Sequence, residues 1–265
     1  MARFRHRRVT ALPINRMIPN ALTLMALCSG LTAIRFCLQE RWEAAVVAVL
    51  VAMLLDGLDG RIARLMGSTS ELGAQLDSLS DVIAFGVTPA VMIYLWTLSD
   101  AGGIGWAACL VYAACCALRL ARFNTALGEE APTPLASRYF VGVPAPAAAA
   151  LALLPLALSF VFGDLLLRSD VLNILSLLGV AALMVSRLPT FSAKRLKLKA
   201  PHRLFVMVGL VVLVALLISE TWITVSFIAL GYLVSIPFSI AQHRRELRRG
   251  IAEAPEEPVL PEDDA

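Results

Sequence analysis

A series of long apolar runs constrains this chain more than any other feature. Hydrophobic residues make up 58% of the sequence and charged residues only 16%. A soluble domain is about 45–50% apolar and about 25% charged, and a single core could not bury this much apolar surface. A membrane-spanning helix needs about 20 mostly apolar residues, and eight segments approach that length. These segments are residues 18–38, 43–66, 80–98, 103–122, 142–162, 170–187, 203–219 and 221–240.

This pattern predicts an all-α, polytopic integral membrane protein with about eight transmembrane helices. We expect a basic N-terminal segment at residues 1–17, a transmembrane domain at 18–240 that carries the functional site, and a disordered tail at 241–265. The net charge of +3 is too small to indicate nucleic-acid binding. The five cysteines lie in apolar stretches without metal-ligand spacing, so they are interpreted as small apolar residues.

Lysine and arginine predict the orientation, because basic loops stay on the cytoplasmic side. With eight spans, the basic clusters at residues 3–16, 187–203 and 244–249 all fall on one side of the membrane. Both termini are therefore expected in the cytoplasm, with the protein integral to the cell (inner) membrane.

The second span contains charges at an unusual depth. Only twelve apolar residues, 44–55, precede Asp56, and they span about 18 Å as a helix. The hydrocarbon core is about 30 Å thick, so Asp56 and Asp59 should lie within the cytoplasmic leaflet. A carboxylate at that depth is costly unless it faces a polar cavity or a cation, which makes a functional role the leading hypothesis.

Two pairs of aspartates are spaced to share helix faces. Asp56 and Asp59 are three residues apart, and Asp77 and Asp81 are four apart. A turn near residues 67–71 would bring the two pairs together. Four like charges repel one another unless a cation neutralises them, and oxygen ligands without nearby His or Cys favour magnesium, manganese or calcium over zinc.

Small and basic residues surround these acids. Gly60, Ala63 and Gly73 leave room for a bulky group, and Arg64 has a planar charged group suited to phosphate. Together with bound cations, they predict a diphosphate site at the membrane surface. The alternative, a salt-bridge cluster between helices, is poorer because four acids would face only Arg61 and Arg64.

In chain order these residues read D-x-x-D-G-x-x-A-R, eight residues, then G-x-x-x-D-x-x-x-D, which resembles the signature of the CDP-alcohol phosphatidyltransferase family. The matching positions are Asp56, Asp59, Gly60, Ala63, Arg64, Gly73, Asp77 and Asp81. The resemblance implies a membrane enzyme, usually a homodimer, that holds two divalent cations, Mg²⁺ or Mn²⁺. It implies that a hydroxyl nucleophile displaces CMP from a CDP-linked substrate. It also implies that the aspartates bind the metals, that Asp81 is the general base, and that the matched glycines, alanine and arginine border the CDP moiety.

The flanking sequences narrow the resemblance. Residues 18–23 resemble the P-N-x-x-T opening of the family's first span, which adds Asn20 and Thr23 to the expected CDP-binding residues. Five further stretches resemble bacterial phosphatidylserine synthases, a branch of the family. They are residues 76–81, 85–90, 118–124, 142–146 and 186–192. This likeness implies CDP-diacylglycerol and L-serine as substrates.

Two arginines end the fourth span, and they are the candidates for binding the acceptor. Arg119 and Arg122 lie three apart, with Asn124 just beyond. They could hold a small carboxylate beside the metals, with Arg122 as the principal ligand. The alternative is that both arginines are interface anchors that reach toward the headgroups.

Other functions are weighed against this one. The same chemistry could use another acceptor, such as glycerol 3-phosphate, inositol phosphate or choline. A cation transporter is a different class, because intramembrane aspartates also mark ion pathways. Against a transporter, the acids crowd one end of two helices and no inverted repeat is visible in the sequence.

Overall fold

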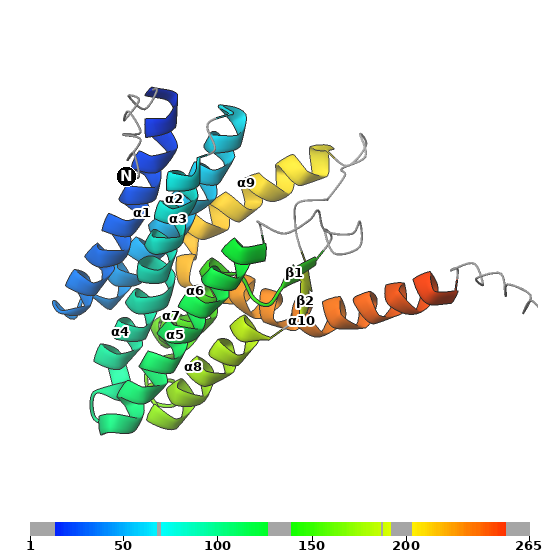
Figure 1. The fold of residues 1–265 in the computed structure, drawn as a ribbon. Coiled ribbons are helices and arrows are strands. Elements are labelled where there is room, and N and C mark those ends of the chain that lie inside the picture. Colours follow the sequence, from blue (N-terminus) through cyan, green and yellow to red (C-terminus); the bar gives the residue numbers. More distant parts are fainter. Residues whose placement is uncertain (1–13, 68–69, 127–138, 187, 192–202, 253–265) are drawn as a thin grey trace, which may run out of the picture.

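The computed structural model describes residues 14–67, 70–126, 139–186, 188–191 and 203–252. They form a bundle of long helices with one short strand pair (Figure 1). The first half contains α1 Ile14–Cys37, α2 Trp42–Leu65, α3 Glu71–Asp81, η1 Val82–Val87, α4 Thr88–Ile93, η2 Tyr94–Leu98 and α5 Gly102–Ala126. The second half contains β1 Tyr139–Val141, α6 Ala145–Ala152, α7 Leu154–Phe162, α8 Asp170–Val185, β2 Pro189–Phe191, α9 Arg203–Ser219 and α10 Thr221–Ala252.

The predicted membrane fold is confirmed. Five helical segments are long and apolar enough to cross a bilayer, and α8 and most of α9 form shorter apolar helices. The helix α2 has 24 residues, the same length as α1, but carries the charges of the aspartate motif. Helical units therefore occupy all eight predicted positions. The five segments that are long and apolar enough to cross a bilayer are Met17–Cys37, Glu71–Leu98, Gly102–Thr125, Ala145–Phe162 and Thr221–Ala241.

Two predicted spans differ from the observed helices in their details. The third was expected to begin at residue 80, but its helix begins at Glu71, where the Ser70 hydroxyl accepts a hydrogen bond from the Gly73 N–H at 3.1 Å. The fifth is interrupted at Leu153, two residues before Pro155, because proline cannot donate the backbone hydrogen bond that a continuous helix requires.

The last part of the chain also differs from the expectation. The helix α10 continues to Ala252, well into the segment 241–265 that was expected to be a disordered tail. Residues 253–265 and 1–13 lie outside the described residues. The strands β1 and β2 pair antiparallel, with Phe140 opposite Thr190, and add a small element that an all-α prediction lacks.

Small residues let α1 and α2 approach closely. Ala26, Ala33, Ala45 and Ala52 are all buried on these two helices, and small side chains are typical of close helix pairs in membranes. The Ser29 hydroxyl donates a hydrogen bond across the interface to the Ala48 carbonyl at 2.7 Å. This packing holds α1 beside the half of α2 that carries the aspartates.

The third span contains a π-helical segment, η1, directly after Asp81. Pro89 has no N–H, so it cannot make the α-helical hydrogen bond to the Phe85 carbonyl. The Tyr112 hydroxyl of α5 donates to that carbonyl at 2.9 Å. Tyr112 and Phe85 are both fully buried, so this bond fixes the third span against α5 in the core of the bundle.

We expect Tyr112→Phe to lower the free energy of unfolding by about 1–3 kcal/mol, because it leaves the buried Phe85 carbonyl without this hydrogen bond. Thermal unfolding of the purified protein in detergent measures the effect. Tyr94→Phe is the matched control, since the Tyr94 ring packs edge-on against Trp106 at 5.0 Å and its hydroxyl bonds to no described residue. Equal unfolding temperatures for the two variants would contradict the role given to Tyr112.

Candidate active site

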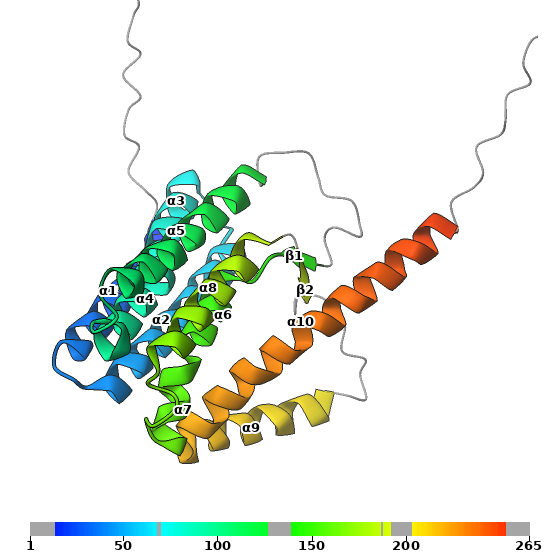
Figure 2. The same cartoon turned by 90° about the horizontal axis from the view of Figure 1, so that it is seen from below.

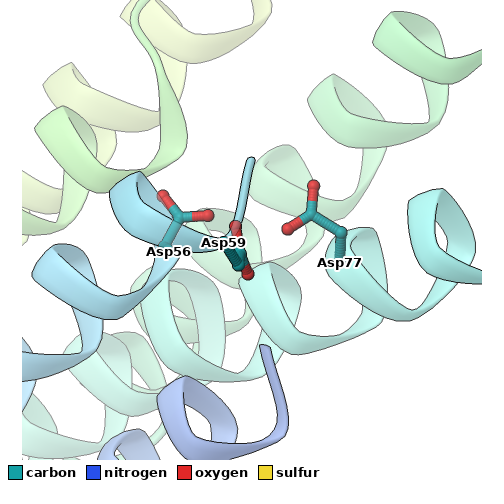
Figure 3. A group of neighbouring side chains, drawn as sticks. All are labelled: Asp56, Asp59 and Asp77. Atoms are coloured by element: carbon teal, nitrogen blue, oxygen red, sulfur yellow. The ribbon is translucent and has the colours of Figure 1, made fainter. Parts of the chain in front are cut away.

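Four aspartates gather at one end of α2 and α3. The carboxylate oxygens of Asp56, Asp59 and Asp77 lie within 4.8 Å of one another, and Figure 3 shows the three side chains turned toward a common point between the two helices. Asp81 lies one turn beyond Asp77 on the same helix and is not in this group of three. The structure thus brings three of the four predicted metal ligands together.

This cluster has the chemistry of a site for a hard cation. Its donors are all carboxylate oxygens, which suit magnesium, manganese or calcium. Within the described part of the chain, no arginine or lysine forms an ion pair with any of the four acids; the ion pair found there joins Arg168 to Asp164 at 3.9 Å. Carboxylates this close must share protons or bind a cation, and a divalent ion fits the residues present.

The helix α1 supports the cluster from one side. The Thr23 hydroxyl donates to an Asp59 carboxylate oxygen at 2.6 Å, and Asp59 is itself buried. The Ser80 hydroxyl donates to the Thr23 carbonyl at 3.0 Å, which ties α1 to the helix of Asp77 and Asp81. A hydrogen bond from a second residue fixes the direction in which a ligand carboxylate points. Thr23 was expected to border CDP, and in this structure it orients Asp59.

The other expected CDP-binding residues lie around the same end of the bundle. A Cβ atom on Gly73 would lie 3.1 Å from the Asn20 side-chain oxygen and 3.1 Å from the Ser70 hydroxyl, so α1 and α3 approach closely there. Arg64 folds back over Gly60, with Nη1 3.7 Å from where a Cβ atom would stand. Ala63 is half-buried, whereas Arg64 is exposed and able to meet an anion.

The three candidate acceptor residues have different surroundings. Arg122 is exposed and its Nη1 donates to the Val185 carbonyl at 3.1 Å. The Asn124 amide donates to the Ser78 hydroxyl at 2.8 Å, next to Asp77 in sequence. Arg119 is half-buried, and its Nε hydrogen-bonds to no described residue. Its guanidinium lies within electrostatic range of Asp81. Of the two arginines, Arg119 is the more buried, and its helix α5 packs against η1, the segment that follows Asp81.

Three residues that contact the site were not anticipated: Ser70, Ser78 and Ser80. Ser70 could have been found, since a serine before a helical run is a strong N-cap signal. Ser78 and Ser80 depend on contacts with α5 and α1. Nothing in the local sequence predicts these long-range contacts.

Residues 16–188 match the family profile described as CDP-alcohol phosphatidyltransferase, and residues 202–237 match a second profile, CDP-alcohol phosphatidyltransferase 2. The chain belongs to the CDP-alcohol phosphatidyltransferase family. It is therefore an enzyme of this type, and the membership confirms the resemblance found in its aspartate motif. The acidic cluster is where the divalent cations of this family's chemistry could be bound.

Similar proteins are found in several bacteria. The chain is 38% identical over 244 residues to a protein of Mycobacterium leprae named CDP-diacylglycerol–serine O-phosphatidyltransferase, covering 92% of this chain and 80% of that protein. A protein of the same name from Helicobacter pylori is 35% identical over 74% of this chain and 81% of the relative. Another, from Bacillus subtilis, is 33% identical over 70% of this chain and 90% of the relative.

Proposed function

We propose that this chain transfers a phosphatidyl group from CDP-diacylglycerol to the hydroxyl of L-serine, giving phosphatidylserine and CMP. The observation that carries the proposal is the cluster of four aspartates on α2 and the third span, with oxygens of three of them within 4.8 Å of one another. The names of the relatives supply the acceptor, and the half-buried Arg119 on α5, which packs against the third span, is consistent with an acceptor that bears a carboxylate.

We further propose that Asp56, Asp59, Asp77 and Asp81 hold two divalent cations, Mg²⁺ or Mn²⁺. When bound, such ions neutralise diphosphate oxygens and the charge that develops on the leaving CMP. The contribution of the chain is a fixed geometry. Thr23 holds the Asp59 carboxylate at 2.6 Å, and packing against α1 keeps α2 and α3 from separating under the repulsion of four acids.

The proposed reaction is a single displacement at phosphorus. The serine hydroxyl oxygen forms a bond to the phosphorus that carries the diacylglycerol, and the bond from that phosphorus to the bridging oxygen breaks. CMP leaves with this oxygen. Asp81 takes the proton of the serine hydroxyl, since a carboxylate positioned within hydrogen-bond reach can act as a general base. Its position one turn beyond Asp77 supports this role.

The two substrates are proposed to bind on different sides of the cluster. Residues of α1, α2 and α3 border the CDP moiety: Asn20, Thr23, Gly60, Ala63, Arg64 and Gly73. On the side of α5, Arg119 binds the serine carboxylate, because a guanidinium can bind a carboxylate with two parallel hydrogen bonds. Arg122 and Asn124, near the end of α5, are proposed to contribute to serine binding on the same side of the cluster.

We also propose that the protein lies in the inner membrane with its active site facing the cytoplasm. The basic clusters at residues 3–16, 187–203 and 244–249 support this orientation. As in the family, the functional unit is proposed to be a homodimer in the lipid bilayer. No nucleic-acid partner is proposed, given the small net charge of +3.

The proposal is tested with the purified protein in liposomes that contain CDP-diacylglycerol and Mg²⁺ or Mn²⁺. Labelled L-serine, glycerol 3-phosphate, inositol phosphate and choline are offered separately, and label in the lipid fraction is measured. Serine should be incorporated and the others should not. Incorporation of glycerol 3-phosphate instead would overturn the choice of acceptor, and incorporation of no alcohol would overturn the proposed reaction.

A further inference from the structure

The helix α1 packs along most of the third span. It contacts α3, the π-helical segment η1 and α4, and Figure 2 shows α1, α2 and α3 together on one side of the bundle, away from α10. Two buried hydroxyl groups of the third span donate to carbonyls of α1. Ser80 donates to the Thr23 carbonyl at 3.0 Å, and Thr88 donates to the Gly30 carbonyl at 3.3 Å. The proposed metal, CDP and acceptor residues include neither Ser80 nor Thr88.

These two hydrogen bonds fix the register of the third span on α1. The acceptors Thr23 and Gly30 are seven positions apart, whereas the donors Ser80 and Thr88 are eight apart with η1 between them. A π-helical turn holds one more residue than an α-helical turn, because its hydrogen bonds reach one residue further. The backbones are also close there, since a Cβ atom on Gly30 would lie 2.9 Å from the Ala84 Cα. The third span therefore cannot slide along α1 without breaking buried hydrogen bonds.

The hydrogen bond from Ser80 ends on the residue that holds a proposed metal ligand. The Thr23 hydroxyl donates to Asp59 Oδ2 at 2.6 Å, and Ser80, Thr23 and Asp59 are all buried. Ser80 stands directly before Asp81 and three residues after Asp77. A buried chain of hydrogen bonds, Ser80–Thr23–Asp59, thus links an aspartate of α2 to the helix that carries the other two.

The spacing of the aspartates is set through α1. Both α2 and α3 pack against it, and the carboxylate oxygens of Asp56, Asp59 and Asp77 lie within 4.8 Å of one another. Without a cation, like charges this close repel one another and favour separation of α2 and α3. A residue that supports a metal ligand therefore affects how tightly the metal binds, and its loss typically costs about 10–100-fold in affinity.

We infer that Ser80 is a positioning residue for the proposed cation site. The inference rests on the proposed function, because it takes the aspartates to bind divalent cations. Ser80 fixes the third span against Thr23, and Thr23 fixes the Asp59 carboxylate, so the spacing between the ligands of α2 and those of the third span is set before any substrate binds. Without the Ser80 hydroxyl, all the carboxylates remain, but the two helices are less firmly placed and the cation binds more weakly.

The test is Ser80→Ala, with Mn²⁺ as the probe. Binding of Mn²⁺ to the folded, purified protein in detergent is measured by electron paramagnetic resonance without either substrate. We expect the Kd for Mn²⁺ to rise about tenfold. Ser159→Ala is the matched control, because Ser159 is also buried but its hydroxyl donates at 2.8 Å to the Leu156 carbonyl of its own helix, α7. An unchanged Kd in Ser80→Ala, or an equal rise in Ser159→Ala, would overturn the inference.

A double-mutant cycle tests the link through Thr23. Thr23→Val removes the hydroxyl that holds Asp59 and should itself raise the Kd for Mn²⁺ about tenfold or more. In that background Ser80→Ala should add less than about threefold, because Asp59 is already free to turn. A full tenfold increase there would contradict positioning through Thr23. Wild-type protein that binds no Mn²⁺ would instead contradict the proposed cation site, so the two failures are distinguishable.

Discussion

Asp77→Asn should lower the rate of phosphatidylserine formation by about a thousandfold or more. Removing one anionic ligand weakens the binding of a cation that would neutralise the diphosphate and the leaving group. Losses of activity of this size are typical when the charge stabilisation of a transition state is removed. Asparagine has nearly the same shape as aspartate, and it removes one of four mutually repelling charges. The unfolding temperature should therefore not fall, and the loss of activity should come from the chemical step and not from unfolding.

The matched control is Asp164→Asn. Asp164 is exposed and pairs with Arg168 outside the aspartate cluster, so this change should leave activity within about twofold. Excess chelator should abolish wild-type activity, and added Mg²⁺ or Mn²⁺ should restore it. Full turnover of Asp77→Asn, or of the wild type in chelator, would contradict metal binding by this cluster.

Arg119→Ala should raise the KM for serine about a hundredfold, because it removes a charge-assisted, two-point contact with the acceptor carboxylate. Arg119→Lys keeps the charge but loses the planar group, so its KM should lie between those of the wild type and Arg119→Ala. The KM for CDP-diacylglycerol should change little in either variant. Initial rates at varied serine and fixed CDP-diacylglycerol measure these effects.

Arg122→Ala is the informative comparison for Arg119. Its guanidinium is exposed and donates to the Val185 carbonyl, so we expect a smaller rise in the KM for serine than in Arg119→Ala. Arg64→Ala should show the reverse pattern, with a raised KM for CDP-diacylglycerol and little change for serine. A larger serine effect for Arg122 than for Arg119 would show that the exposed arginine is the principal acceptor ligand.

The sequence predicted the shared helix faces better than it predicted the helix ends. Asp56 and Asp59, and likewise Asp77 and Asp81, share a face because helix geometry is local, but the approach of the two pairs depends on how α2 and α3 pack. The start of the third span depended on the Ser70 cap, and the break in the fifth on Pro155. Both signals are in the sequence but are weaker than a run of apolar residues.

Long-range contacts could not be predicted in the same way. Whether Arg119 or Arg122 can reach an acceptor depends on which face of α5 turns toward the third span and which toward the end of α8. The Thr23–Asp59 hydrogen bond depends on the approach of α1 to α2, which is set by alanines and serine at their interface. These are results of packing among helices, and spacing along one helix does not contain them.

The most direct measurement of the central claim is the stoichiometry of the reaction. Purified protein in liposomes with CDP-diacylglycerol, a divalent cation and labelled L-serine should release CMP and form labelled phosphatidylserine in equal amounts. CMP release should depend on serine and disappear in Asp77→Asn. Release of CMP at the same rate without serine, or formation of phosphatidylserine by Asp77→Asn at the wild-type rate, would contradict the account.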